Sequence, residues 1–236
     1  MQIDNDLDLA KLEEELAFEI VSIKDNEMEV NVSGMDAPMA NALRRVMIAD
    51  ISTMAFDKVV LWQNTSIIHD EVLAHRLGLV PVFADPNEFI AKSASDDFNE
   101  HNSIKFKLNV KCTRKAEYKD YKMQDLVNLD PEQYLNDSTI YAGSMSWEPL
   151  GNQAAELKCT PRILHEKILL MKLRENQEVE FEIYCSKNTG RTHAKWSPVA
   201  TAFYKLKPLI QIKGELAEEE VSPLPPRLTH DSRSTS

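Results

Sequence analysis

The sequence predicts an α+β fold, mainly β with two or three helices, and three observations lead to this prediction. Several segments alternate polar and apolar residues with the period of two that half-buried strands require. Two other segments space their apolar residues as a helix does. Finally, 43% of the 236 residues are hydrophobic, which is enough for a core in one or two domains.

The first predicted element is a β-hairpin, which follows a flexible acidic tail over residues 1–14. Apolar residues alternate over residues 16–20 and again over residues 28–32. Between these runs lie Asp25 and Asn26, residue types that tolerate the left-handed backbone of tight turns. We therefore expect two antiparallel strands joined by a short turn.

A helix is predicted next, over residues 37–50. Asp36 is a suitable N-cap, and Pro38 falls in the first turn, where no N–H is needed. At about 100° per residue the helix has two different faces. One face carries Met39, Leu43, Val46 and Met47, and the opposite face carries Asn41, Arg44, Arg45 and Ile48. Because arginine is enriched at protein interfaces, we interpret the second face as a partner surface; an ordinary exposed helix face is the alternative.

The remainder of the chain is predicted to be mostly β. Strands are expected at residues 59–62, 104–112, 141–147, 179–185 and 200–206, a helix at residues 70–77 and a polar loop at residues 85–103. Gly78 is a suitable C′ residue for that helix. Residues 214–236 are first acidic and then rich in Pro and Ser, so they are predicted to be disordered.

Composition excludes several classes of protein. A net charge of −11 argues against DNA binding as the main task, because phosphate neutralisation needs a basic surface. Cys112, Cys159 and Cys185 are far apart and form no CxxC pair, which disfavours a disulfide framework and a zinc site. No apolar run approaches the roughly 18 residues of a membrane span. We expect an intracellular protein with no metal, cofactor or membrane partner.

No catalytic motif is complete, and we predict that the chain is not an enzyme in itself. His165 and Glu166 begin an HExxH-like stretch, but Leu169 occupies the place of the second histidine. The 6 glycines include no nucleotide-binding loop. Glu71 and His75 can meet on one helix face, as a general base or, in the interpretation that we favour, as an interface pair. A hydrolase with a distant Cys–His pair is the enzymatic alternative.

A stand-alone nucleic-acid-binding module is the second alternative. Lys105, Lys107 and Lys111 share one side of a predicted strand, and Lys195 precedes Trp196. Such residues can contact phosphates and stack on bases. The favoured interpretation is the solvated face of a strand and local packing, because the total charge is acidic.

Three motifs in a fixed order resemble one known family, the α-like subunits of RNA polymerases. Residues 41–49, with the sequence NALRRVMIA, resemble the signature helix of that family. Residues 64–66 and 70–81 are similar to the companion segment of its archaeal and eukaryotic members. Residues 193–202, HAKWSPVATA, resemble its return strand. The resemblance runs in order from residue 16 to residue 208.

Within the family, residues 147–153 and 197–202 are most similar to the larger α-like subunit shared by RNA polymerases I and III. The polymerase II counterpart has a cysteine cluster for zinc, and many archaeal counterparts have an iron–sulfur-type cluster; this sequence has neither. Trp196 is the residue that archaeal or polymerase II members prefer. An archaeal or polymerase II-type subunit is therefore the alternative.

The resemblance implies a non-catalytic assembly subunit. A discontinuous dimerisation domain, residues 15–54 and 187–213, would pair with a smaller α-like subunit, and an insert domain, residues 55–186, would interrupt it. The pair would then dock the second-largest polymerase subunit, so that DNA is met only through the complex. The implied location is the nucleus and nucleolus in a eukaryote, and the cytoplasm otherwise.

The resemblance also implies particular site residues. Contacts with the second-largest subunit would come from Asn41, Arg44, Arg45 and Ile48, with His193, Lys195 and Trp196 close by. Leu43, Val46 and Met47 would face the core or the dimer partner. In the family a further segment and a long helix follow, and residues 226–233 resemble the lead-in to that helix. We expect the helix to be absent here, in a fragment, an alternative product or a minimal form.

Overall fold

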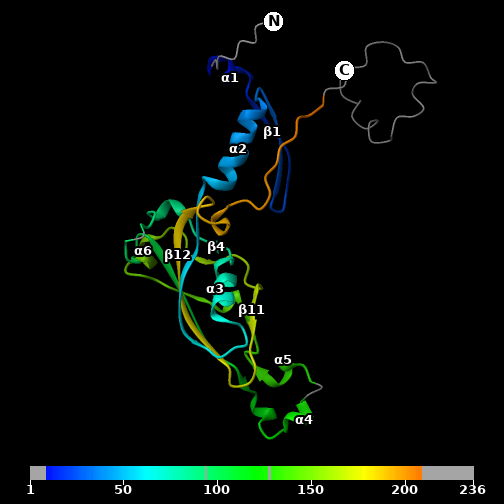
Figure 1. The fold of residues 1–236 in the computed structure, drawn as a ribbon, viewed down its shortest axis with the longest axis vertical. Helices are drawn as coiled ribbons and strands as arrows, with labels where there is room; N and C mark the ends of the chain where they lie inside the picture. Colours follow the sequence, from blue (N-terminus) through cyan, green and yellow to red (C-terminus); the bar gives the residue numbers. More distant parts are fainter. Residues whose placement is uncertain (1–8, 94, 127–128, 209–236) are drawn as a thin grey trace, which may run out of the picture. The chain divides into compact units, whose positions relative to one another are not determined.

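The computed structural model describes residues 9–93, 95–126 and 129–208 (Figure 1). The chain divides into two compact units, residues 1–204 and residues 205–236. All described helices and strands belong to the first unit, and residues 205–208, the described part of the second, form neither. Several sheets and a few helices make up the first unit. The predicted α+β class is confirmed.

The predicted N-terminal hairpin is present. β1 (Ala17–Lys24) pairs antiparallel with β2 (Glu27–Ser33). Asp25 in the turn has a φ of 50°, the left-handed conformation that Asp tolerates better than most residues. A short helix, α1 (Leu9–Glu15), precedes the hairpin, where the sequence led us to expect part of a flexible tail. Residues 1–8 of that tail lie outside the described residues.

The predicted first long helix is also present, as α2 (Ala37–Ala49). The Asp36 carboxylate accepts a hydrogen bond from the Met39 N–H at 3.1 Å, so it caps the helix as its side chain predicts. Gly34 joins the hairpin to this cap with a φ of +72°. A Cβ there would collide with the Glu15 carbonyl, so both the backbone angle and the space require glycine.

A four-stranded antiparallel sheet forms the centre of the first unit. Its strands, in spatial order, are β3 (Ser52–Asn64), β12 (Glu178–Thr189), β5 (Ser103–Lys111) and β9 (Ser146–Glu148). Phe181 on β12 lies opposite Leu61 on β3 and Leu108 on β5. Apolar residues of three strands therefore share one face, and the strands predicted at residues 59–62, 104–112 and 179–185 are confirmed.

Shorter elements surround this sheet. Those between β3 and β5 are α3 (Asp70–Gly78), β4 (Val82–Phe83) and η1 (Pro86–Glu88). Those between β5 and β9 are β6 (Thr113–Arg114), η2 (Ala116–Tyr118), α4 (Met123–Leu126), α5 (Pro131–Tyr134), β7 (Leu135–Asn136), β8 (Thr139–Tyr141) and η3 (Ala142–Ser144). The last are α6 (Gln153–Glu156), β10 (Arg162–Ile163), β11 (Leu169–Lys172) and η4 (Ala194–Trp196). Pairs form between β4 and β10, β8 and β11, and β6 and β7.

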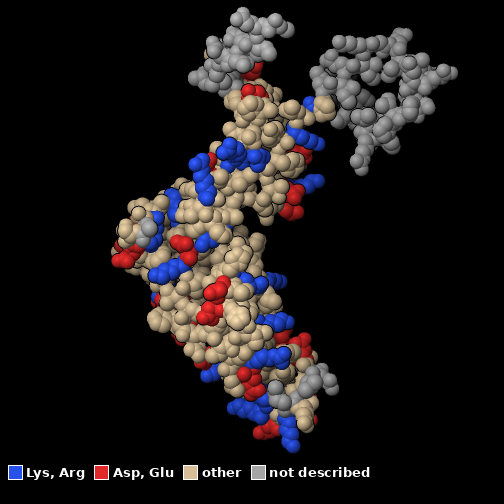
Figure 2. Space-filling view, in the orientation of Figure 1, with Lys and Arg blue, Asp and Glu red and all other residues tan. Residues whose placement is uncertain are grey.

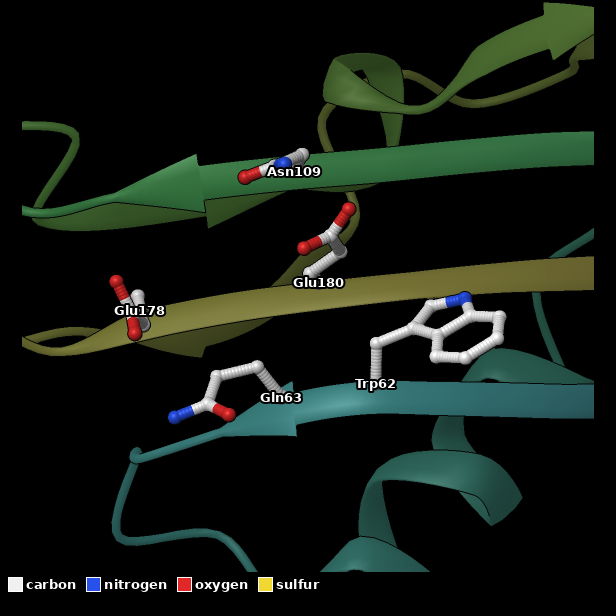
Figure 3. Close-up of a pocket in the computed structure, with 5 residues that line it drawn as sticks. All are labelled: Trp62, Gln63, Asn109, Glu178 and Glu180. Atoms are coloured by element: carbon white, nitrogen blue, oxygen red, sulfur yellow. The ribbon is translucent and has the colours of Figure 1, made fainter.

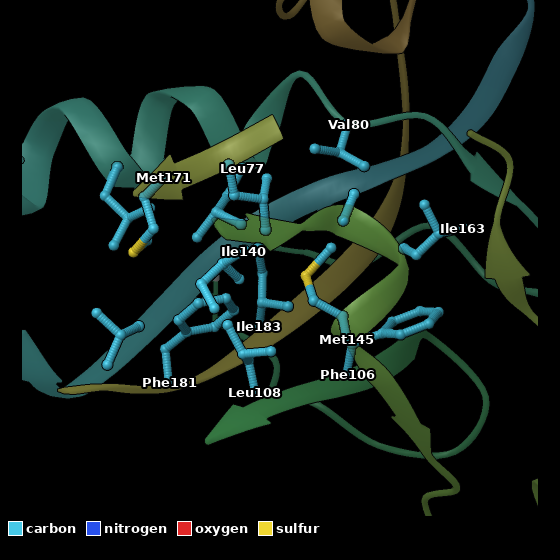
Figure 4. Close-up of a cluster of buried hydrophobic side chains, with 14 of the residues drawn as sticks. Leu77, Val80, Phe106, Leu108, Ile140, Met145, Ile163, Met171, Phe181 and Ile183 are labelled. Carbon is cyan, nitrogen blue, oxygen red and sulfur yellow. The ribbon is translucent and has the colours of Figure 1, made fainter. Parts of the chain in front are cut away.

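The hydrophobic core lies on the apolar face of the sheet (Figure 4). Leu73 and Leu77 of α3 are fully buried there, which confirms the predicted second helix and its apolar stripe. Phe56 and Phe106 meet edge to face with their ring centroids 5.5 Å apart, a favoured aromatic geometry. Among the described residues, the core is built from β3 and the elements that follow it, and not from the hairpin or α2.

Three local predictions are wrong. Gly78 is not a C′ residue, because it is the last residue of α3; the C-cap is Leu79, whose φ of −93° needs no glycine. The strand over residues 141–147 is broken by η3, where the Ala142 and Gly143 N–H groups bond to the 166–168 loop. Residues 200–206 form no strand. Phe203 there is 80% exposed, and no strand of the described chain pairs with this segment.

Candidate subunit interface

The hairpin–helix unit, which we define as β1, β2 and α2, has an exposed apolar surface. No residue from Ala17 to Ala49 is buried in the described structure. Phe18, Ile20, Ile23 and Met28 of the hairpin are all more than half exposed, with Ile23 and Met28 both at 64%. Val21 sits at a bulge in β1, so apolar residues reach both faces of the hairpin. Several exposed large apolar side chains on one unit are typical of surfaces that bind another protein.

The two faces of α2 differ in composition, but unlike an ordinary amphipathic helix it buries neither face. Leu43 and Val46 are 40% and 44% exposed, and Met47 is half-buried. On the opposite face Asn41, Arg44 and Ile48 are half-buried. Each side of α2 thus keeps exposed side chains, and the apolar side exposes Leu43 and Val46.

Asn41 and Arg44 act together on the polar face of α2. The Asn41 side-chain oxygen accepts hydrogen bonds from Arg44 Nε at 3.1 Å and Nη2 at 2.9 Å, which fixes the guanidinium. Arg45 is exposed, and within the described residues no ion pair holds it. Figure 2 shows basic side chains gathered over α2, whose basic residues are Arg44 and Arg45. This surface offers one preorganised and one free guanidinium.

The segment after β12 closes onto the end of α2. Gly190 lies so close that a Cβ would collide with the Ile48 carbonyl. The Arg191 N–H donates to the Ala49 carbonyl at 3.2 Å, and its guanidinium pairs with Asp50. Residues 48–50 and 190–191, far apart in the sequence, therefore meet at one point. The sequence analysis gave no role to Gly190 or Arg191 in this contact. The only sequence feature that could have indicated it is an isolated Gly–Arg pair after a predicted strand.

His193 caps η4, and hydrogen bonds of Trp196 to Thr53 and Ser186 hold this turn against β3 and β12. The Lys195 N–H donates to His193 Nδ1 at 3.0 Å, and Lys195 Nζ lies 4.2 Å from the Trp196 ring centroid. Asp57, at a bulge in β3, faces the same lysine at 3.5 Å. The turn thus presents an exposed imidazole above a half-buried lysine.

Trp196 itself is an internal anchor. Its side chain is 3% exposed, and its indole N–H donates to the Ser186 carbonyl at 3.0 Å. Its own carbonyl accepts from the Thr53 hydroxyl at 2.6 Å. The expectation that Trp196 contacts a partner directly does not fit this burial, because the side chain is used to hold η4 on the sheet. The same burial removes it as a stacking platform for a base.

The structure brings the predicted site residues together in two groups. Asn41 and Arg44 are hydrogen-bonded on α2, and Lys195 and Trp196 of η4 contact each other below the cap residue His193. No hydrogen bond or ion pair joins the two groups in the described part of the chain.

Two of the three lysines of the stripe, Lys105 and Lys111, form ion pairs with glutamates of neighbouring strands. Lys105 pairs with Glu182 at 3.0 Å and with Glu148 at 3.1 Å, and Lys111 pairs with Glu178 at 3.1 Å. Phosphate binding needs cations that remain available to release counterions. These pairs therefore argue against the stand-alone nucleic-acid-binding module.

Catalytic and metal chemistry find little support in the described residues. No three His, Cys, Asp or Glu side chains there lie close enough to hold a metal ion. Burial raises the pKa of the Cys112 and Cys185 thiols, which makes both poor nucleophiles at neutral pH. Cys159 is exposed. Glu71 and His75 share α3, but no hydrogen bond or ion pair of the described chain joins them.

The architecture combines a β-rich body with a hairpin–helix unit that has no buried residue from Ala17 to Ala49. The family model of the RNA polymerase Rpb3/RpoA insert domain matches residues 49–202. The chain therefore belongs to this family of RNA polymerase subunits, and the resemblance read from the three motifs is confirmed.

Its relatives narrow the assignment. The human DNA-directed RNA polymerases I and III subunit RPAC1 is 40% identical over 92% of this chain and 62% of the human protein. The Saccharomyces cerevisiae subunit of the same name is 36% identical over 94% of this chain and 68% of the yeast protein. The Dictyostelium discoideum RNA polymerase II subunit rpb3 is 32% identical over 89% of this chain and 64% of that protein. Similarity is thus higher to the polymerase I and III subunits.

The chain spans about three fifths of the length of the curated relatives that it matches, 62% for the human protein. None of the helices in the described residues has the length and apolar character that crossing a membrane requires.

Proposed function

We propose that the chain is a non-catalytic assembly subunit of DNA-directed RNA polymerases I and III. In this role it pairs with a smaller α-like subunit and then docks the second-largest subunit. The observation that carries the proposal is the hairpin–helix unit, which has no buried residue from Ala17 to Ala49 and exposes large apolar side chains. The names of its relatives support the choice of polymerase.

The dimer surface is proposed to include the apolar side of α2 and the hairpin. Leu43 and Val46 are exposed beside half-buried Met47, and burying them against a partner would recover hydrophobic free energy. Obligate interfaces of this kind commonly bury roughly 2,000 Å² or more, which an open hairpin and helix face can supply together. We keep residues 15–54 and 187–213 as the dimerisation domain and residues 55–186 as the insert.

The docking surface for the second-largest subunit is proposed to lie on the polar side of α2 and on η4. Arg45 and His193 are exposed, and Arg44 is preorganised by Asn41. Ile48, on the same side of α2, adds an apolar contact to this proposed surface. Lys195 and Trp196 serve as supports that hold His193 in place. Assembled in this way, the chain would act in the nucleus, and in the nucleolus as part of polymerase I, and would meet DNA only through the complex.

The test is co-purification with the smaller α-like subunit after co-expression. Leu43→Asp combined with Val46→Asp should reduce the retained partner about tenfold or more, since central interface residues dominate binding. Both residues are exposed in the single chain, so circular dichroism should stay unchanged. Ile67→Asp, at an insert residue that is 81% exposed, is the matched control and should retain the partner. Equal retention by the double variant would remove the proposed dimer surface.

A further inference from the structure

The outer face of the four-stranded sheet carries a ladder of opposite charges with one gap. On this face β12 presents Glu178, Glu180 and Glu182, and β5 presents lysines. Glu178 lies opposite Lys111, and Glu182 lies opposite Lys107. Opposite charges across antiparallel strands stabilise a sheet in this arrangement. The gap occurs at the middle glutamate.

Glu180 is flanked by neutral amides on both neighbouring strands. Asn109 of β5 lies opposite it on one side, and Gln63 of β3 lies opposite it on the other. Lys105 and Lys111 are already bound to other glutamates, and Lys107 lies opposite Glu182, not Glu180. The half-buried Glu180 carboxylate has no ion pair or side-chain hydrogen bond within the described residues. Both oxygens of this unpaired carboxylate can therefore still accept hydrogen bonds from a cation.

An exposed tryptophan stands beside this carboxylate. The register of β3 and β12 shifts between Glu180 and Phe181, which places Trp62 at a bulge. Trp62 is 64% exposed. It lines one pocket together with Gln63, Asn109, Glu178 and Glu180, and Figure 3 shows Glu180 between Asn109 and the indole. Bulges re-aim side chains, and tryptophan is among the residues most enriched where proteins bind.

We propose that this pocket binds an arginine side chain from a segment of a partner protein. The guanidinium would stack on the Trp62 indole and donate to the Glu180 carboxylate, with Asn109 and Gln63 as further acceptors. Arginine fits better than lysine because its planar group stacks on an aromatic face and forks to a carboxylate at once. The carboxylates repel a nucleic-acid backbone, and a single indole is no cage for a small quaternary cation. The inference does not depend on the proposed polymerase role.

The test is an NMR titration of the full chain, observed at the indole N–H of Trp62. Trp62→Phe assigns the signal, and the indole of buried Trp196 is the internal reference. The probes are a capped Gly-Arg-Gly peptide, the matched Gly-Lys-Gly peptide and a citrulline peptide that keeps the shape of arginine without its charge. We expect the arginine peptide to move the Trp62 signal at the lowest concentration, and citrulline to move it least.

Two variants distinguish binding in the pocket from a general attraction of the cationic peptide to acidic residues. Glu180→Gln should weaken binding of the arginine peptide about fivefold, as the loss of one charge-assisted contact predicts. Glu182→Gln removes an equal charge from a residue already paired with Lys105, and should change binding less than about twofold. Equal effects of the two variants, or equal binding of arginine and citrulline, would overturn the proposal. So would a Trp62 signal that moves with protein concentration alone, because a second copy would then occupy the pocket.

Discussion

Lys105 shows how one residue sets the electrostatics of the sheet. Its burial favours the neutral amine, but hydrogen bonds to Glu182 and Glu148 outweigh this and raise the pKa of Lys105. The same hydrogen bond from Lys105 holds the pKa of Glu182 below its usual value. The stability that comes from Glu182 is present above the ordinary carboxyl pKa and is lost as pH falls through its lowered value. The stability from Lys105 is present below the ordinary lysine pKa and is lost as pH rises through its raised value.

Lys105→Met should therefore lower the free energy of unfolding most at neutral pH. The difference from the wild type should shrink in acid, where Glu182 becomes protonated, and in strong base, where wild-type Lys105 loses its proton. Urea unfolding across a pH series measures this. Lys111→Met is the control, because its side chain is 57% exposed and exposed pairs contribute little. A Lys105→Met effect that is constant with pH would show that the loss is one of packing alone.

Gly190 is a residue whose role depends on close approach. Gly190→Ala places a Cβ against the Ile48 carbonyl and Ala49 Cα, which are backbone atoms that cannot turn aside. We expect a loss of roughly 1–3 kcal/mol in the free energy of unfolding, as for other overpacked sites. Gly78→Ala is the matched control, since its nearest atoms would be 3.8 Å and 3.9 Å away, and a helical position favours alanine by about 0.5–1 kcal/mol. Equal effects in thermal melts would contradict the close approach.

Among the elements, α2 carries most of the proposed function. Its apolar face exposes Leu43 and Val46, and its polar face carries Arg44 and Arg45. The two faces can be read from the sequence because helical periodicity fixes which residues share a side. The sequence could not predict that both faces of α2 stay unburied in the single chain. An amphipathic pattern shows which residues share a face, but it does not show what covers that face.

Arg44→Glu combined with Arg45→Glu should abolish capture of the second-largest polymerase subunit while the smaller α-like subunit stays bound. The reason is that reversed charges at a docking surface repel the groups that the guanidinium groups would meet. Pull-down from a reconstituted mixture measures the capture. Lys158→Glu with Lys167→Glu makes the same change in net charge at exposed insert residues and should bind normally. Unchanged capture by the arginine variant would sink this assignment.

Whether a predicted strand forms depends on whether another strand of the chain pairs with it. The alternation over residues 104–112 predicts β5 correctly, because β12 and β9 from the same chain pair with it. The alternation over residues 200–206 is similar, but no described strand is available to pair there. Residues 141–147 alternate too, yet contacts with the 166–168 loop replace strand pairing. Periodicity predicts a strand's faces, while its existence depends on a partner that the local sequence does not contain.

At the scale of the whole molecule, the cysteines set an expectation about metal. Cys112 and Cys185 are buried and Cys159 is exposed, and the described residues offer no cluster for an ion. We expect the purified chain to carry less than about 0.1 zinc per molecule, because a structural zinc site needs four ligands in one place. Elemental analysis after purification without chelator measures this. Stoichiometric zinc would show that residues outside the described ranges complete a site.

The family could be predicted from the sequence because three motifs occur in one order, and the fold class because polar and apolar residues alternate along several strands. The pocket at Trp62 could not, since it depends on a bulge and on two amides that come from different strands. The burial of Trp196 was equally hidden, because a tryptophan beside a lysine reads the same whether it anchors a turn or meets a partner.

The most direct measurement is light scattering on the chain co-expressed and purified with the smaller α-like subunit. The account predicts a stable complex with the summed mass of one copy of each chain, because the open hairpin–helix unit needs a partner to cover it. A chain that elutes alone as a stable, monodisperse monomer would contradict the account, since its apolar surface would then need no partner.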